Sequence, residues 1–148
     1  MKWVTREHGN VERVACPWLI QRFIDKDAEF AFVPNHTNPS DITDGIPYDM
    51  KGVELGHHQG RCSFESFLLK YGLDDDQALV MMGSIIHGAD IPVDIDITPE
   101  SAGLRAIAFG FHYLGISDHE KISLQSVMYD ALYAWCQRKT GRLSPEVS

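Results

Sequence analysis

The chain has 148 residues, 44% of them hydrophobic and 10% aromatic, and its formal net charge is −8. This length and apolar content are typical of one folded domain and exclude a disordered chain. The excess of 21 acidic over 13 basic residues argues against a nucleic-acid backbone or an anionic membrane surface as partner, because both attract a basic face.

The N-terminal segment is expected to alternate short strands with one helix. Residues 2–5 (KWVT) and 28–34 (AEFAFVP) have the composition and alternation of strands. Residues 10–25 between them predict a helix with Asn10 as a candidate N-cap. Pro17 leaves two alternatives, because a helix either begins at this proline or kinks there.

The middle of the chain is expected to be loop-rich. Residues 35–47 (NHTNPSDITDGIP) carry turn residues throughout and predict a loop with room for one helical turn. Residues 48–55 (YDMKGVEL) are compatible with a second strand or an extended segment. Residues 89–97 (ADIPVDIDI) alternate and are compatible with an extended segment, although Pro92 excludes a central strand.

The rest of the chain is expected to be helical. Four helices are predicted, each preceded by a capping residue: 64–71 after Ser63, 75–88 after Asp74, 99–115 after Thr98, and 119–139 after Asp118. We therefore expect a mainly α fold of about five helices with a small strand element in the N-terminal half. The chain should form one compact domain over residues 1–148, with residues 141–148 as a tail.

The cysteines and the hydropathy indicate the compartment. Cys16, Cys62 and Cys136 are far apart and form no CxxC pair, so a disulfide framework is not expected and a reducing compartment fits. The first ten residues lack the apolar core of a signal peptide, and no apolar run approaches the ~20 residues that span a bilayer. We expect a cytoplasmic protein.

One segment concentrates ligand-type side chains. Residues 52–67 (GVELGHHQGRCSFESF) place Glu54, His57, His58 and Cys62 within nine positions among three glycines. If this segment is a strand, Glu54 and His58 share a face, whereas a turn brings Glu54 and His57 together. The glycines favour the turn and therefore His57, although His58 stays an alternative. The competing interpretation is a polar surface loop that happens to be rich in ligand-type side chains.

Two further residues complete a candidate metal site. Asp90 follows a predicted helix end, and His119 lies in a first helical turn, where the helix dipole keeps imidazole neutral and able to bind a metal. We predict that Glu54, His57, Asp90 and His119 hold a divalent transition metal, with Zn, Fe and Mn as candidates. No established metal motif such as HExxH occurs, so this site depends on assembly in space.

Arginines indicate an anionic ligand. Arg13 and Arg61 lie in the polar N-terminal half, and a guanidinium donates several hydrogen bonds to a tetrahedral oxyanion. We predict that these two residues attract such an anion. Ion pairing with nearby acidic residues is the alternative.

The segments RVACPWLIQRFID, ELGHH, RCSFESFLLKYGL, HGAD and YDALYAW together resemble the C-terminal domain of the ChrB-type chromate-resistance family, from Trp3 to about Trp135. The resemblance implies a role in chromate-dependent regulation or resistance. It supplies no set of catalytic residues.

Two functions follow as hypotheses. The first is a cytoplasmic metal-binding domain that acts in chromate or oxidative-stress resistance, with a redox metalloenzyme as its catalytic form. The alternative is a non-catalytic chromate or oxyanion sensor, or a protein-interaction module. The expected partners are a small inorganic oxyanion or a metal ion, without nucleic acid or membrane, and a homodimer is one possible assembly.

Overall fold

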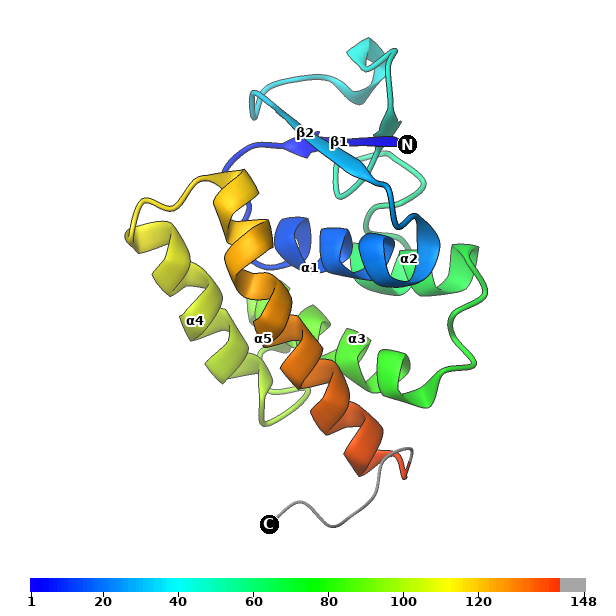
Figure 1. The fold of residues 1–148 in the computed structure, drawn as a ribbon, viewed down its shortest axis with the longest axis vertical. Helices are drawn as coiled ribbons and strands as arrows, with labels where there is room; N and C mark the ends of the chain where they lie inside the picture. Colours follow the sequence, from blue (N-terminus) through cyan, green and yellow to red (C-terminus); the bar gives the residue numbers. More distant parts are fainter. Residues whose placement is uncertain (142–148) are drawn as a thin grey trace.

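The computed structural model describes residues 1–141, so most of the expected tail, residues 142–148, lies outside the described part. A small parallel sheet lies above a body of helices (Figure 1). The described residues form five α-helices: α1 (Glu12–Leu19), α2 (Ser63–Lys70), α3 (Gln77–Asp90), α4 (Ser101–Tyr113) and α5 (Asp118–Lys139). The mainly α fold predicted from the sequence is confirmed.

The sheet has three parallel strands in the order β2-β1-β3: β1 (Lys2–Arg6), β2 (Glu29–Val33) and β3 (Ile46–Pro47). The helix α1 and the turn after it connect β1 to β2, as parallel neighbours require. The predicted strands at 2–5 and 28–34 are confirmed. The extended segment expected at 48–55 is wrong, because β3 ends at Pro47 and the chain then turns repeatedly through glycine-rich sequence.

The alternative in which the first helix begins at Pro17 is wrong, because the proline lies inside α1. The helix begins at Glu12, five residues before the proline, and continues into a π-helical turn at Ile20–Ile24. Trp18 is buried on this helix, and its indole N–H donates to Asp130 of α5 over 2.8 Å. Packing of this kind outweighs the local cost of a proline inside a helix.

The helix starts shift slightly from the predicted ones. The N-cap of α3 is Asp76 rather than Asp74, and its carboxylate accepts from the N–H groups of Ala78 and Leu79. The N-cap of α5 is Ser117 rather than Asp118. Residues 89–97 are not extended, since α3 runs to Asp90 and a 3₁₀ turn follows at Pro92–Asp94.

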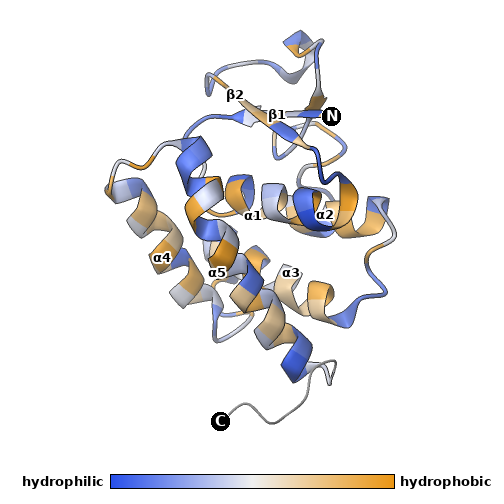
Figure 2. Cartoon of the chain, in the orientation of Figure 1, coloured by the Kyte–Doolittle hydropathy of each residue, from blue (hydrophilic) through white to orange (hydrophobic). Residues whose placement is uncertain are grey.

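The helix α3 is the centre of the core. It packs against α2, α4 and α5, and its apolar side chains Leu79, Met82, Ile85 and Ile86 are fully buried. Figure 2 shows hydrophobic residues over much of α3 and α4. None of the described helices is long and apolar enough to span a lipid bilayer.

A tether from the start of α5 holds the turn that leads from β1 into α1. The Asp118 carboxylate accepts hydrogen bonds from the backbone N–H groups of His8 (2.9 Å) and Gly9 (3.1 Å). The ammonium of Lys121, which is 1% exposed, donates to the Gly9 carbonyl over 2.8 Å. A Cβ atom on Gly9 would lie 2.3 Å from the Cβ of Arg13, so only glycine fits this turn. The first residues of α1 are therefore held by α5.

We expect Asp118→Ala to lower the free energy of unfolding by about 2 kcal/mol, because it removes two charge-assisted hydrogen bonds. Urea denaturation followed by circular dichroism measures this change. Asp44→Ala is the matched control, since Asp44 only pairs with the exposed Lys2 side chain and should cost less than about 0.5 kcal/mol. Equal losses in the two variants would contradict the tether.

Candidate functional site

A polar cleft opens where the start of α1, the loop after β3 and the end of α3 meet. Its volume is about 590 Å³. It is lined by residues 8–13 and 49–52, together with Arg6, His57, Asp90, Arg105 and Phe109. Four separate stretches of the chain therefore contribute to one concave surface, which is typical of a ligand site.

Three carboxylates surround a single imidazole nitrogen at the base of this cleft. The Nε2 atom of His57 lies 2.7 Å from Glu12 Oε1, 3.4 Å from Asp90 Oδ2 and 3.7 Å from Asp49 Oδ1. The side chain of Glu12 is 0% exposed, whereas that of His57 is 46% exposed toward the solvent. The cluster is thus buried at Glu12 and accessible to solvent at His57.

The backbone and its hydrogen bonds fix the carboxylates in place. The second oxygen of Glu12 accepts from the N–H of Phe64 over 2.6 Å. Asp49 has a positive φ of 50°, a conformation that Asp tolerates better than most residues, and its carboxylate accepts from the Ser63 hydroxyl over 2.6 Å. The guanidinium of Arg13 lies 3.3 Å from the same carboxylate. The start of α2 therefore orients both acids.

Burial and mutual repulsion shift the pKa values of the acidic side chains. Burial, with the charge of Asp49 nearby, raises the pKa of Glu12 to about 8. Burial and the charge of Asp90 raise the pKa of Asp49 to about 6. The carboxylates of Asp90 and Glu12 raise the pKa of His57 to about 10. Burial alone would raise the pKa of Asp90, but the contacts with His57 and Glu12 outweigh it and lower that pKa. These pKa shifts mean that, without a bound cation, Glu12 and His57 hold their protons more tightly than the same side chains do in water.

The structure brings together two of the four residues predicted as metal ligands. His57 and Asp90 are members of the cluster, with Nε2 and Oδ2 in contact at 3.4 Å. His58 is directed elsewhere, with its Nε2 atom 2.6 Å from the Val53 carbonyl oxygen. The glycine-rich loop is a turn, so His57 rather than His58 faces the carboxylates.

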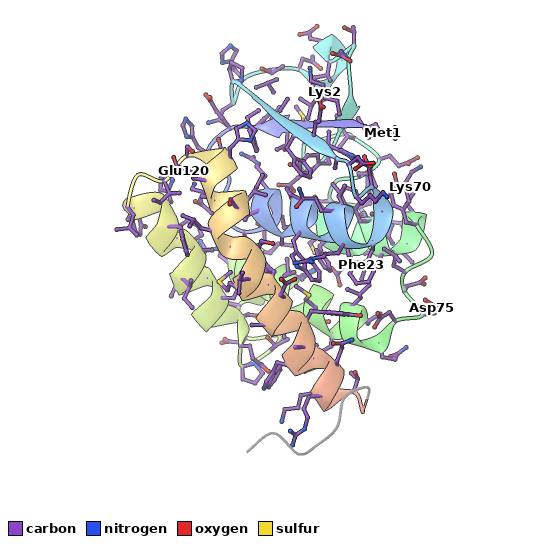
Figure 3. The ribbon with its side chains drawn as sticks, in the orientation of Figure 1. Met1, Lys2, Phe23, Lys70, Asp75 and Glu120 are labelled. Atoms are coloured by element: carbon purple, nitrogen blue, oxygen red, sulfur yellow. The ribbon has the colours of Figure 1, made fainter. Side chains whose placement is uncertain are left out.

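The expected convergence of Glu54 and His119 with these residues is wrong. Glu54 is 71% exposed and pairs with Lys70 of α2. His119 is exposed at the start of α5, where its ring contacts the edge of Phe32. Figure 3 shows Lys70 and Glu120, the neighbour of His119, at opposite sides of the molecule. The local spacing of Glu54 and the first-turn position of His119 are local properties, and neither determines where the fold puts these residues.

The two predicted anion-binding arginines also separate. Arg13 lines the cleft beside Asp49. Arg61 lies outside it, in the short bridge formed with His58, and its Nη1 donates to Gln59 over 3.4 Å. Arg6 and Arg105 line the cleft instead.

Sequence reasoning missed Glu12 and Asp49. An acidic residue in the first turn of a helix normally complements the helix dipole, and an aspartate in a turn-rich loop normally caps a turn. One signal for Glu12 was available: it lies one residue after Val11 and two before Val14, at the edge of the buried face of α1.

The family description "ChrB, C-terminal domain" matches residues 3–136, which include the whole cluster. The chain belongs to the ChrB C-terminal domain family. A protein named Protein ChrB, from Cupriavidus metallidurans, is 35% identical over 134 residues. That match covers 89% of this chain and 40% of the relative, so the chain spans about two fifths of the length of the curated protein that it matches. No solved structure matches the chain.

In metal-free solution, this ChrB C-terminal domain should lose stability as the pH rises. The raised pKa values of Glu12, Asp49 and His57 mean that the folded state binds protons more tightly than the unfolded state. Stability is then greatest below pH 4.5 for the Glu12 contribution and is lost as the pH rises to about 8. The depressed pKa of Asp90 acts in the opposite sense, but only in more acidic solution.

Urea denaturation in EDTA from pH 5 to 9 should show this decrease. At about 1.4 kcal/mol per pH unit and proton, the contribution of Glu12 between pH 5 and 8 is on the order of 4 kcal/mol. Glu12→Gln should make the decrease between pH 5 and 8 shallower, whereas Glu54→Gln should leave it unchanged. A wild-type profile that is flat or rises over this range would contradict the crowded carboxylates.

Proposed function

We propose that this domain binds a divalent metal ion through Glu12, Asp49, His57 and Asp90. The observation that carries the proposal is the charge of the cluster. Without a metal ion, the raised pKa values of Glu12 and His57 keep a proton on both groups at neutral pH. When a metal ion displaces these protons, the three carboxylates around His57, beside the single guanidinium of Arg13, carry two uncompensated negative charges. A divalent cation would balance them, and burial makes the uncompensated state costly.

The donor set indicates which ions fit. Carboxylate oxygens are hard ligands and imidazole is borderline, so a set of three carboxylates and one imidazole suits Mn²⁺ or Fe²⁺ better than an ion that prefers sulfur. Zn²⁺ also accepts these donors. The hydrogen bonds from Ser63 and Phe64 leave one oxygen of Glu12 directed at His57 and hold the carboxylates in fixed orientations. The exposed side of His57 leaves room for a further ligand from the cleft.

Metal content tests this site directly. Protein purified without a histidine tag and reconstituted with Mn²⁺ should hold about one equivalent per chain, measured by ICP-MS after desalting. His57→Gln and Asp90→Asn should weaken Mn²⁺ binding at least about tenfold, measured by the EPR signal of the unbound ion.

The residues that the sequence suggested and the fold placed elsewhere are the matched controls. His119→Gln and Glu54→Gln remove the same functional groups from surface positions outside the cleft and should keep wild-type affinity. A wild-type protein that retains less than ~0.2 equivalent after reconstitution would contradict the proposal, as would equal losses in the cluster and control variants.

We infer further that the ligand entering the cleft is a small oxyanion, in keeping with the chromate-resistance role that the family resemblance implies. Arg6, Arg13 and Arg105 line the cleft that the metal cluster faces. An anion there would meet a metal ion on one side and guanidinium donors on the other. A bound Mn or Fe ion is capable of electron transfer, so the same arrangement would serve a redox metalloenzyme.

The alternative function is a non-catalytic oxyanion sensor. The observation that favours it is Arg13, whose guanidinium is anchored by the Arg6 and Glu7 carbonyls and so presents a fixed donor without any metal. In this case the carboxylate cluster would only position the arginine.

Calorimetric titration with chromate, sulfate and phosphate separates the two functions. We expect saturable heat that Arg13→Gln weakens about tenfold or more, because a charge-assisted contact is lost, while Arg61→Gln keeps the wild-type affinity. Heat that disappears in EDTA supports the metal-dependent function, and heat that survives EDTA supports the sensor. Equal weakening by Arg13→Gln and Arg61→Gln would contradict an anion site in this cleft.

A further inference from the structure

A second group of ligand atoms lies where α2 begins against α3. Cys62, Glu65 and His87 each offer one donor atom, and these three atoms lie within 4.8 Å of one another. Cys62 is 0% exposed and His87 is 6% exposed, whereas the Glu65 side chain is 27% exposed, so the group is buried except at Glu65. It shares no residue with the carboxylate cluster and differs from it by containing sulfur.

The start of α2 holds two of the three donors in register. Cys62 is the N-cap residue, and its backbone N–H donates to Glu65 Oε1 over 3.0 Å. This bond fixes the Glu65 carboxylate beside the thiol. The packing of α2 on α3 then brings the same oxygen to His87.

The imidazole of His87 is held from both sides. Its Nε2 atom lies 2.6 Å from Asp94 Oδ2, and its Nδ1 atom lies 2.6 Å from Glu65 Oε1. A carboxylate on the outer nitrogen is the arrangement by which proteins orient a metal-binding histidine. With the proton on Nε2, the Nδ1 lone pair faces the Glu65 oxygen. At 2.6 Å these two atoms share a proton in a hydrogen bond, and a metal ion would displace that proton and move the two ligand atoms apart.

We propose that Cys62 Sγ, Glu65 Oε1 and His87 Nδ1 form a second metal site, distinct from the carboxylate cluster and suited to Zn²⁺. One thiolate, one imidazole and one carboxylate are the ligand types of tetrahedral zinc sites, and three protein ligands leave a fourth position for water or another small molecule. Binding would convert the Cys62 thiol to a thiolate and release two protons to solvent, one from this thiol and one from the His87–Glu65 hydrogen bond. The Asp94 carboxylate positions His87 without contacting the ion.

The two sites adjoin at the first turn of α2. The N–H of Phe64, which lies between Cys62 and Glu65 in the chain, donates to Glu12 of the carboxylate cluster. The Cys62 side chain also contacts Glu12, so a hard, oxygen-rich site and a softer, sulfur-containing site would be immediate neighbours at one helix start. The chemistry of the donors predicts that each prefers a different ion.

Cobalt tests the sulfur-containing site separately, because only a thiolate ligand gives Co²⁺ a sulfur-to-metal charge-transfer band in the near ultraviolet. The wild-type protein, reduced and freed of metal, should develop this band on titration with Co²⁺ and lose it when Zn²⁺ is added. Cys62→Ser should remove at least about nine tenths of the band, and Glu65→Gln should weaken Co²⁺ binding about tenfold.

Two control variants test whether the band comes from Cys62 and whether the two sites are independent. Cys16→Ser changes another fully buried thiol and should leave the band intact. Asp49→Asn removes a member of the carboxylate cluster and should abolish tight Mn²⁺ binding while leaving the Co²⁺ band unchanged. A wild-type protein that gives the Co²⁺ band but binds no Mn²⁺ would overturn the proposed function alone.

Three results would overturn the second site. The first is a wild-type spectrum without the sulfur band at a slight excess of Co²⁺. The second is a band that persists in Cys62→Ser. The third is a band that Cys16→Ser removes. The first result needs no variant, so it stands even if Cys62→Ser fails to fold, and it would leave His87 as an imidazolium paired with two carboxylates.

Discussion

The burial of the Glu12 carboxylate is the constraint on which the site depends. A carboxylate that is removed from water must either take up a proton or be compensated by donors and positive charge. Here the N–H of Phe64 and the ring of His57 each contact one of its oxygens. Glu12 thereby joins α1, the loop that carries His57, and the start of α2 into one unit. Asp49 and Asp90 approach the same imidazole, so the compensation that serves one acid is shared by three.

The placement of both ligand groups follows from the way α2 begins. Cys62 and Ser63 lie at its N-terminus, where backbone N–H groups are free to bind acidic side chains. Glu12 accepts a hydrogen bond from the Phe64 N–H in the first turn, and Glu65 accepts one from the N–H of the cap residue Cys62. A helix start normally binds one anion, and this one organises acids from two directions.

The sequence predicted the helices well because their signals are local. The periodic apolar residues of α3 and the capping acids before it are sufficient to place the helix, although Asp76 replaced Asp74 as the cap. The strand expected at 48–55 failed because residues such as Asp49 and Gly52, with their positive φ angles, turn the chain where residue type suggested extension. The site was only half predictable. His57 was found from its glycine-rich loop, but the burial of Glu12 depends on contacts with residues 57 and 64, which no local pattern encodes.

The tether formed by Asp118 and Lys121 has a consequence for how the protein is made. The turn that presents Glu12 is fastened by side chains more than a hundred positions later in the chain. A growing polypeptide therefore emerges from the ribosome with its first acidic ligand loosely placed, and the pocket is completed only after α5 has emerged. An ion bound by the proposed cluster would then be captured only after that point, by a pocket that already has its final shape.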